Sequence, residues 1–375
     1  MQTLLVRPIA GNERFGLGHF FRIEPLCLEY IAAALQQRGH AVQIADLRFA
    51  PPIERLLRRQ RPALVGIATS HTQDTADALS LARRIKRIDP TVFILIGGHA
   101  AAVYPSPFFA PAVDEICFED GEQVVPDLAD ALQRGQPLRE VAGLWVNRHG
   151  VGNGGRRQPL DAPPEFVQGP CSPTRIALDQ VPLPARRLMR PFQHNYLCVN
   201  MRPVYLVETA RGCPFRCSFC TIWQHVDRSF RHRAIEHVCE DLAQVGDKVF
   251  IADDLFWHPR RHSFDLAKAL GRRGIRKHWA LVQTRTDLVA RNPQLLEAWR
   301  GFAHYFDIFF GFESPTDDGL AGFDKDASTR AIEEAVDLCR RLGYGITGNF
   351  IVDPDWGEED FRRLWDFTAR LGLNR

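Results

Sequence analysis

Short apolar runs alternate with longer amphipathic segments along the first 149 residues. The runs that fit strands lie at residues 3–8, 41–46, 63–70, 91–98 and 114–120. Between them, residues 25–39 and 74–88 carry apolar positions three and four apart, as expected for helices with one buried face. The alternation predicts an α/β domain over residues 1–149, built on an open, doubly wound, Rossmann-like parallel sheet.

The alternation stops between residues 150 and 203, where glycine and proline concentrate, as in VGNGGRRQPLDAPPEF. We interpret this segment as a linker. Strand and helix patterns then alternate again over residues 204–375. The predicted strands there cover residues 204–210, 248–254, 278–284, 306–314 and 345–353. This second string of five strand–helix units is compatible with a parallel barrel.

Composition places the protein among ordinary globular chains. Its 375 residues suggest two domains, and a net charge of +2 gives no basic field of the kind that nucleic-acid binding needs. No run of about 18 apolar residues is present, and the first residues lack the apolar core of a signal peptide. We therefore expect a cytoplasmic protein with no nucleic-acid partner. Nine cysteines in such a chain favour metal or core positions over disulfides.

Three of the cysteines follow the first predicted strand of the second half. Cys213, Cys217 and Cys220 have the spacing C-x3-C-x2-C within RGCPFRCSFC. Thiolates at such spacings can hold a cubic iron–sulfur cluster, which normally takes four cysteine ligands, so that one iron stays open for a chelating cofactor or substrate. The alternative is zinc, which needs a fourth ligand, and His225 is the nearest candidate.

With an aromatic residue before its last cysteine and a strand before its first, this motif resembles that of the radical S-adenosylmethionine (SAM) superfamily. The resemblance implies a [4Fe-4S] cluster whose open iron binds SAM and cleaves it to a 5'-deoxyadenosyl radical. It further implies that residues 204–375 form a partial (β/α)6-type barrel, which we expect to lack the last strand and a C-terminal region, and that residues at the strand ends contact SAM. The positions that match are Phe219, Asp253, Asp254, Gln283, Arg285 and Glu313. We expect Arg285 to pair with the SAM carboxylate as a planar fork, and a helix N-cap is the alternative role for Asp254.

The first half resembles the cobalamin-binding subgroup of this superfamily, in which the corrin lies over the carboxyl edge of the sheet. The residues expected to contact it are Thr69, Ser70, His71, Gly97, Gly98, His99, Gly121 and Glu122. Some cobalamin proteins carry a cobalt-binding histidine after the second strand, whereas this chain has Asp46 and Arg48 there. We therefore expect a lower cobalt face that is unligated or lies near Arg48. His71 and His99 stay open as cobalt ligands or as corrin-edge contacts.

A cobalamin domain joined to a radical SAM barrel implies methyl transfer from methylcobalamin to an unactivated sp3 carbon. The runs RPVYLVETARGCPFRCSFC and GDKVFIADDLFWHP resemble the hopanoid C-3 methylase family. That resemblance implies C-3 of a hopanoid lipid as the target, a reductant such as flavodoxin or ferredoxin, and peripheral contact with the inner face of the membrane. An apolar substrate needs an apolar pocket, and its candidate residues are Phe256, Trp257, Phe309 and Phe310.

Other functions fit part of the same pattern. Within the superfamily they are the oxidative cyclase of porphyrin biosynthesis and the methylation of a peptide or antibiotic. A cobalamin sensor with an inactive barrel would not need an intact cysteine triad. A methylthiotransferase would need three further cysteines in the first half, where Cys27 and Cys117 are too few.

Overall fold

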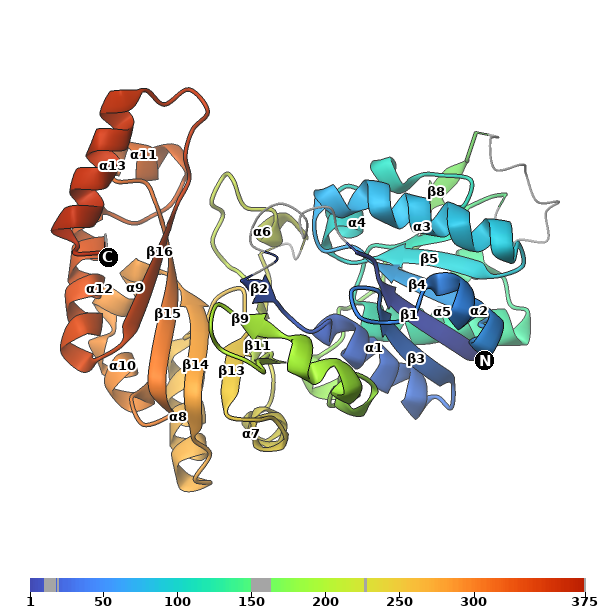
Figure 1. Cartoon of the computed structure of the whole chain (residues 1–375), viewed down its shortest axis with the longest axis horizontal. Coiled ribbons are helices and arrows are strands. Elements are labelled where there is room, and N and C mark those ends of the chain that lie inside the picture. Colours follow the sequence, from blue (N-terminus) through green and yellow to red (C-terminus); the bar gives the residue numbers. More distant parts are fainter. Residues whose placement is uncertain (10–17, 19, 150–162, 226–227, 374–375) are drawn as a thin grey trace. The chain divides into compact units, whose positions relative to one another are not determined.

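The protein is described from a computed structural model, drawn in Figure 1. The structure describes residues 1–9, 18, 20–149, 163–225 and 228–373. Contacts divide the chain into two compact units, Met1–Arg202 and Pro203–Arg375. The second unit thus begins one residue before the point at which the strand and helix pattern resumes in the sequence.

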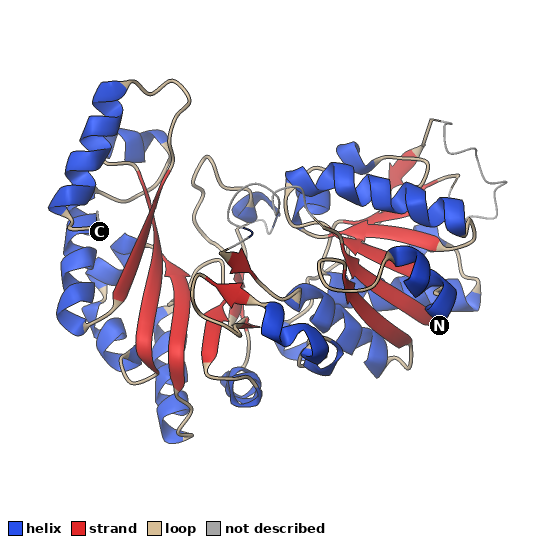
Figure 2. Ribbon diagram, in the orientation of Figure 1, coloured by secondary structure: helices blue, strands red, loops and turns tan. Residues whose placement is uncertain are grey.

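A seven-stranded sheet forms the centre of the first unit (Figure 2). Its parallel part has the order β3-β1-β4-β5-β6, and each of these strands coincides with one predicted from the sequence. They are β1 (Gln2–Arg7), β3 (Ala41–Asp46), β4 (Leu64–Ala68), β5 (Phe93–Gly97) and β6 (Glu115–Cys117). Two antiparallel strands that the sequence did not indicate, β7 (Leu144–Asn147) and β8 (Phe166–Gln168), extend the sheet. Such short strands carry too few residues to show a period.

Helices cover both faces of this sheet. The helices α1 (Leu26–Gln37) and α5 (Gly121–Arg134) pack together and share one apolar core. The helices α2 (Ile53–Gln60) and α3 (Thr75–Ile88) pack together in a second core, which lies on the other face. Because the parallel strands are buried on both faces, they read as continuous apolar runs. The predicted doubly wound α/β sheet is confirmed.

Strand order decides where this sheet can bind a ligand. The chain enters at β1, moves outward to β3, and then returns past β1 to β4, β5 and β6. Connections therefore leave β1 and β4 in opposite directions. A crevice for ligands forms at such a switch point, outside the carboxyl ends of the strands. The residues predicted to contact cobalamin lie at these ends or in the segments that follow them.

Much of the segment interpreted as a linker folds onto the first unit. Its strand β9 (Leu197–Cys198) pairs with β2 (Phe21–Arg22), and the side chains of Met189 and Tyr196 are buried in the core that α1 and α5 share. By contacts, residues 163–202 belong to the first unit. Residues 150–162 lie outside the described part of the chain.

The second unit is built on five parallel strands, in the order β10-β13-β14-β15-β16. They are β10 (Tyr205–Val207), β13 (Lys248–Ile251), β14 (Lys277–Thr284), β15 (Ala303–Glu313) and β16 (Gly345–Phe350). Helices follow the strands as predicted. They are α7 (Ile235–Gln244), α8 (Arg260–Arg272), α9 (Thr286–Arg291), α10 (Pro293–Trp299), α11 (Asp317–Gly322), α12 (Thr329–Leu342) and α13 (Glu358–Arg370). The five strand–helix units match the predicted partial barrel.

The two faces of this sheet differ. Alternate strand residues enter one apolar core with residues of the helices, and Phe256, Trp257 and Phe310 belong to that core. Phe309 alternates with Phe310 and therefore points to the opposite face. Of the four aromatic residues considered for a substrate pocket, Phe309 is the one that the helix-side core does not include.

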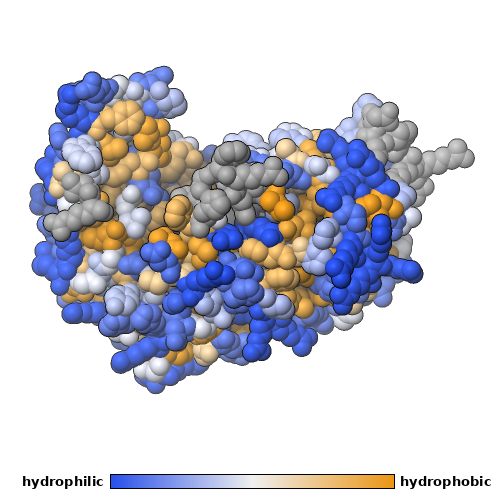
Figure 3. Space-filling model, in the orientation of Figure 1, coloured by the Kyte–Doolittle hydropathy of each residue, from blue (hydrophilic) through white to orange (hydrophobic). Residues whose placement is uncertain are grey.

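Some apolar side chains stay on the surface of the second unit (Figure 3). Val352, Phe361 and Trp365 are 47%, 50% and 63% exposed, the last two on α13. Within the described residues, we find no helix with the length and apolar character to cross a membrane.

Candidate functional site

The cysteine triad lies on a loop that two short strands hold. The strand β11 (Ala210–Gly212) pairs with β12 (Phe230–His232), and the cysteines lie between them, before the short helix α6 (Ile222–His225). The carbonyl oxygen of Cys217 accepts hydrogen bonds from the amide of Cys220 and from Trp223 Nε1, each at 3.0 Å. These two bonds turn the loop back on itself between Cys217 and Trp223.

Burial governs the ionisation of two thiols in this loop. It raises the pKa of Cys213 to about 11, with a smaller contribution from Cys220, and it also raises the pKa of Cys220. A metal that binds sulfur reverses this effect, because a coordinating thiol is deprotonated outright. Among the residues that the structure describes, no three His, Cys, Asp or Glu side chains lie close enough to hold one single metal ion. A cubic cluster offers each thiolate a separate iron, so three neighbouring thiols fit it.

A pocket of about 120 Å³ opens beside these thiols. It lies at the carboxyl ends of β13, β14 and β15, where ligands bind in parallel sheets. Its lining residues are Cys213, Phe215, Cys217, Phe219, Cys220, Trp223, Asp254, Leu255, Gln283, Thr284, Arg285, Gly311, Glu313 and Lys325. The structure therefore brings together the three cysteines and all of the predicted SAM contacts except Asp253.

The two aspartates after β13 have different surroundings. Asp253 Oδ1 accepts hydrogen bonds from the amides of Thr209 and Ala210 at 2.6 and 3.0 Å. Its Oδ2 accepts a hydrogen bond from the Thr209 hydroxyl. Complete burial raises the pKa of Asp253 to about 8, against the opposing effect of these hydrogen bonds. Asp254 Oδ2 accepts from the amide of Gly212 at 2.8 Å, and burial raises its pKa too. Asp253 thus anchors the backbone that leads to the cysteines, whereas Asp254 also reaches the pocket.

Glu313 ends β15 in a buried ion pair that the sequence did not reveal. Its Oε1 lies 2.8 Å from Nζ of Lys325, which also donates to the Gly311 carbonyl at 2.6 Å. The two side chains are 11% and 4% exposed. Lys325 lies in the loop FDKD, whose sequence shows neither the hydrophobic period of a helix or strand nor a known motif. The sequence therefore did not predict that it lines the pocket. Glu313 has a φ of 63°, a backbone conformation that is uncommon outside glycine.

Arg285 and Gln283 come from the end of β14. Gln283 is exposed at the pocket, and its carbonyl accepts the amide of Phe256 at 2.9 Å. Arg285 is buried, with its Nε 2.8 Å from Oδ1 of Asp287 and its guanidinium 3.9 Å from the ring centroid of Phe215. The guanidinium already has protein partners, which the prediction of a SAM carboxylate fork did not anticipate.

In the first unit, the loop after β4 offers its later residues to a ligand. Ser70 and His71 are exposed, and their amides both donate to Oδ2 of Asp74, at 2.8 and 2.9 Å. Thr69 is buried, and its hydroxyl donates to the Gly97 carbonyl at 3.0 Å. The hydroxyl of Thr69 therefore joins two strand ends, while Ser70 and His71 face outward.

The loop after β5 lies next to it. Burial lowers the pKa of His99, and the nearby His71 lowers it further, so the structure brings the two predicted imidazoles together. Gly98 has a φ of 111°, and a Cβ there would lie 2.3 Å from the Thr69 carbonyl oxygen. A neutral imidazole is the form that binds a metal, so His99 fits either role left open for it.

Four further residues predicted to contact cobalamin are closely packed against other parts of the protein or are buried. A Cβ on Gly97 would lie 3.2 Å from Cβ of Cys117, and one on Gly121 would lie 2.8 Å from Cδ1 of Ile31. These glycines allow close packing between elements. Glu122 is buried on α5, and Asp46 is fully buried at the end of β3.

Arg48 is held by Asp46. Its Nε and Nη2 donate to the two carboxylate oxygens at 2.8 and 2.5 Å, and Nη2 also donates to the Ile23 carbonyl. Tyr196 donates its hydroxyl to Oδ2 of the same carboxylate at 3.1 Å. The charge of Arg48 is thus compensated within the protein, and its approach to a cobalt face stays a prediction.

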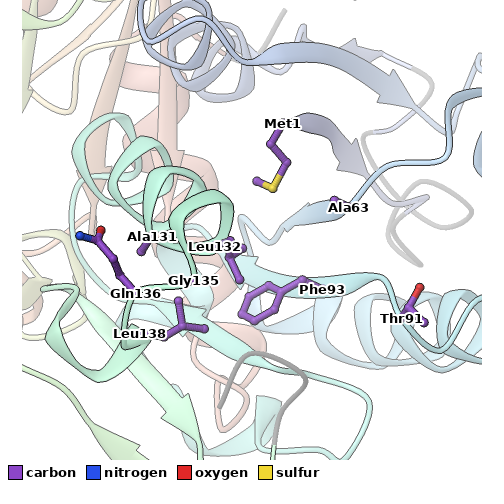
Figure 4. A pocket seen from close by; sticks show the side chains of 9 residues that line it. All are labelled: Met1, Ala63, Thr91, Phe93, Ala131, Leu132, Gly135, Gln136 and Leu138. Carbon is purple, nitrogen blue, oxygen red and sulfur yellow. The ribbon is translucent and has the colours of Figure 1, made fainter. Parts of the chain in front are cut away.

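A larger pocket, of about 310 Å³, lies at the other edge of the first unit (Figure 4). It is lined by residues at the amino ends of the strands, among them Met1, Ala63 and Phe93, and by residues of α5 and of the segment that follows it. No titratable side chain or predicted site residue lines it. Because ligands of such sheets bind at the carboxyl ends, we assign it no function.

Comparison with known protein families gives matches in both units. A B12 binding domain matches residues 20–129, and the Radical SAM superfamily matches residues 207–368. The matched ranges contain the predicted cobalamin contacts and the cysteine triad, respectively.

The matches to curated relatives extend over both units of the chain. The chain is 31% identical over 354 residues to the hopanoid C-3 methylase of Methylococcus capsulatus, a match that covers 92% of this chain and 64% of the relative. It is 25% identical over 371 residues to the anaerobic magnesium-protoporphyrin IX monomethyl ester cyclase of Cereibacter sphaeroides, covering 92% and 57%. The chain therefore spans less than two thirds of the length of these relatives.

One solved structure with a similar fold is OxsB, a cobalamin-dependent S-adenosylmethionine radical enzyme with aqua-cobalamin and S-adenosylmethionine bound. It aligns with a TM-score of 0.75 at 20% identity, over 98% of this chain and 51% of that chain. At this identity the similarity concerns the fold of the two units.

Proposed function

This chain belongs to the cobalamin-dependent radical SAM enzymes, and we propose that it transfers a methyl group from methylcobalamin to an unactivated sp3 carbon of an apolar substrate. Its cofactors are cobalamin, a [4Fe-4S] cluster and SAM. When bound, they supply a carbon-centred oxidant and a transferable methyl group. We propose C-3 of a hopanoid lipid as the target carbon, because the similarity to a hopanoid C-3 methylase extends over 92% of the chain.

The observation that carries the proposal is an apolar strip beside the pocket of the cysteines. Leu281 and Phe309 each lie two residues before a pocket residue on the same strand, and so on the same face of the sheet. Strand pairing places Leu206, Phe250 and Leu281 side by side. This face of the sheet therefore carries aliphatic and aromatic groups directly below the reactive end. Leu206 and Leu281 are buried, whereas Phe250 and Phe309 are partly exposed and can line the apolar pocket that such a substrate needs.

Residues of the pocket contribute binding and orientation. Cys213, Cys217 and Cys220 would hold the cluster, and Asp254, Gln283 and Glu313 would contact SAM. Lys325 fixes the Glu313 carboxylate by a 2.8 Å ion pair, so that its position does not depend on the cofactor. At the strand ends of the first unit, Ser70, His71 and His99 would contact cobalamin. An external one-electron donor of the flavodoxin or ferredoxin class is required.

A lipid substrate would also bring the protein to the inner face of the membrane. We propose peripheral contact there. Flotation with vesicles that contain hopanoids tests it, and a protein that stays at the bottom of the gradient with and without substrate would argue against such contact.

The test of the function is the lipid profile of a host that makes unmethylated hopanoids. Expression of this protein should add a ring-A methyl group, located by mass spectrometry, and the Cys217→Ala variant should add none. If cobalamin and iron are present in the protein but no methylhopanoid forms, the hopanoid assignment fails. A cyclised porphyrin without methyl gain would instead favour the reaction of the porphyrin cyclase relative.

A further inference from the structure

The guanidinium of Arg285 contacts the cysteine loop and other groups of the protein. Its Nη1 lies 3.5 Å from Sγ of Cys217, a residue 68 positions away in the chain. Its Nη2 donates to the Asp326 carbonyl at 3.4 Å, and its Nε donates to Asp287. All three guanidinium nitrogens thus have a partner within the protein.

Two neighbours set the plane of this guanidinium. The carboxylate of Asp287, 2% exposed, fixes the Nε side at 2.8 Å. The ring of Phe215 stacks on the guanidinium at 3.9 Å, within the range of a cation–π contact. Because Phe215 precedes Cys217 by two residues, one loop presents both the ring and the thiol. The arginine and this loop therefore position each other.

Burial makes the contact with Cys217 electrostatically strong. The side chain of Arg285 is 8% exposed, and Cys217 is also 8% exposed, so water screens the two groups poorly. Arginine keeps its charge at all accessible pH values. When Cys217 carries an iron, the group beside the guanidinium is a thiolate, and the contact becomes a charge-assisted hydrogen bond.

We infer that Arg285 is a positioning residue that donates a hydrogen bond to the thiolate of Cys217 and thereby raises the reduction potential of the cluster. The inference rests on the proposed cluster ligands but not on the proposed substrate. The bound cluster would supply the redox step, for which an external one-electron donor protein would provide the electron that converts one ferric iron to ferrous iron. No bond to Arg285 forms or breaks. The added negative charge is stabilised by the fixed cation, and hydrogen bonds to sulfur are a known determinant of such potentials.

The experiment is a potentiometric titration of the cluster in the intact protein, monitored by electron paramagnetic resonance. Arg285→Met should make reduction at least tenfold less favourable, which corresponds to a shift of about 59 mV to more negative potential. Arg285→Lys should shift the potential less, because it keeps the charge and loses the fork. If Arg285→Met does not retain its iron, the lysine variant carries the measurement.

Arg291→Met is the matched control. Arg291 lies 3.9 Å from Oδ2 of the same Asp287, but its side chain is 70% exposed and makes no contact with the cysteine loop in the described contacts. Its removal changes the net charge by the same amount and should leave the potential unchanged. An equal shift in both variants would show a general charge effect and overturn the inference.

The affinity for SAM separates this role from that of a SAM ligand. A positioning residue predicts a dissociation constant that changes by less than about threefold in Arg285→Lys, well under 1.4 kcal/mol. A tenfold or greater loss of affinity with an unchanged potential would make Arg285 a SAM ligand and overturn the inference. A wild-type protein that takes up no cluster would instead contradict the proposed function.

Discussion

At the scale of single residues, the strand ends of the second unit carry polar groups with different tasks. Adjacent aspartates after β13 look equivalent in the sequence, yet Asp253 binds backbone amides and Asp254 reaches the pocket. Their order along the chain was enough to predict a polar site. Which carboxylate faces the cofactor could not be predicted, since it depends on the position of Thr209, 44 residues away from Asp253.

Asp253 should make stability depend on pH. Its pKa is raised to about 8, against about 3.9 in an unfolded chain, so its contribution is complete below about pH 4 and is lost as the pH rises through 8. Asp253→Asn mimics the protonated acid and lacks this titration. Denaturant unfolding at about pH 5.5, well below the raised pKa, and at about pH 8, close to it, should show wild type losing stability relative to the variant.

Asp253→Ala provides the comparison for this prediction. It leaves the amides of Thr209 and Ala210 without their acceptor and should be about 1–3 kcal/mol less stable than Asp253→Asn at both pH values, since neither variant titrates. A difference between wild type and Asp253→Asn that stays constant between the two pH values would mean that Asp253 is ionised in the folded protein.

At the scale of elements, the loops that follow β4 and β5 are in close contact at the carboxyl edge of the first sheet. Apolar periodicity was sufficient to predict both strands and the helices after them. The glycines after β5 were predicted as ligand contacts, whereas the structure gives Gly98 a second task, the close approach to Thr69. Periodicity cannot reveal that contact, because it joins two loops that are adjacent only in the folded sheet.

Gly98→Ala should therefore disturb this edge. Its φ of 111° and ψ of 176° suit glycine alone, with strain of about 1–3 kcal/mol for alanine, and the Cβ would lie 2.3 Å from a backbone oxygen. We expect lower stability and weaker cobalamin binding, measured by unfolding and by absorbance titration.

Gly135→Ala is the control for Gly98→Ala. It also has a positive φ, 66°, but a Cβ there would meet nothing within 4 Å. It should cost about 1 kcal/mol and leave cobalamin affinity unchanged. Equal effects of the two variants on cobalamin binding would remove Gly98 from the site.

At the scale of the whole molecule, each unit has its own core and its own site residues. The cysteine triad belongs to Pro203–Arg375 and the predicted cobalamin contacts belong to Met1–Arg202. The division near residue 203 could be predicted, because glycine and proline interrupt the pattern there. The packing of residues 163–202 onto the first unit could not, since these residues have little periodicity and form only short strands.

This separation predicts independent loading of the two cofactors. Cys217→Ala should lower iron from about four atoms per chain to nearly none, since the cluster loses one of three protein ligands. Cobalamin binding should persist, because no predicted corrin contact lies in the second unit. Metal analysis and the absorbance of bound cobalamin measure both. Joint loss of iron and cobalamin would show that the two sites depend on each other.

The sequence by itself determined the α/β class, the two strings of strands and helices and the cysteine triad, and it predicted the sheet edges at which we expect ligands. These features are local, because they depend on periodicity, turn residues and spacing within about ten residues. Only the tertiary structure decided the partners of the buried polar groups, such as Lys325 for Glu313, Tyr196 for Asp46 and Cys217 for Arg285. Such contacts depend on strand order and register, which join residues far apart in the chain, and no local pattern encodes them.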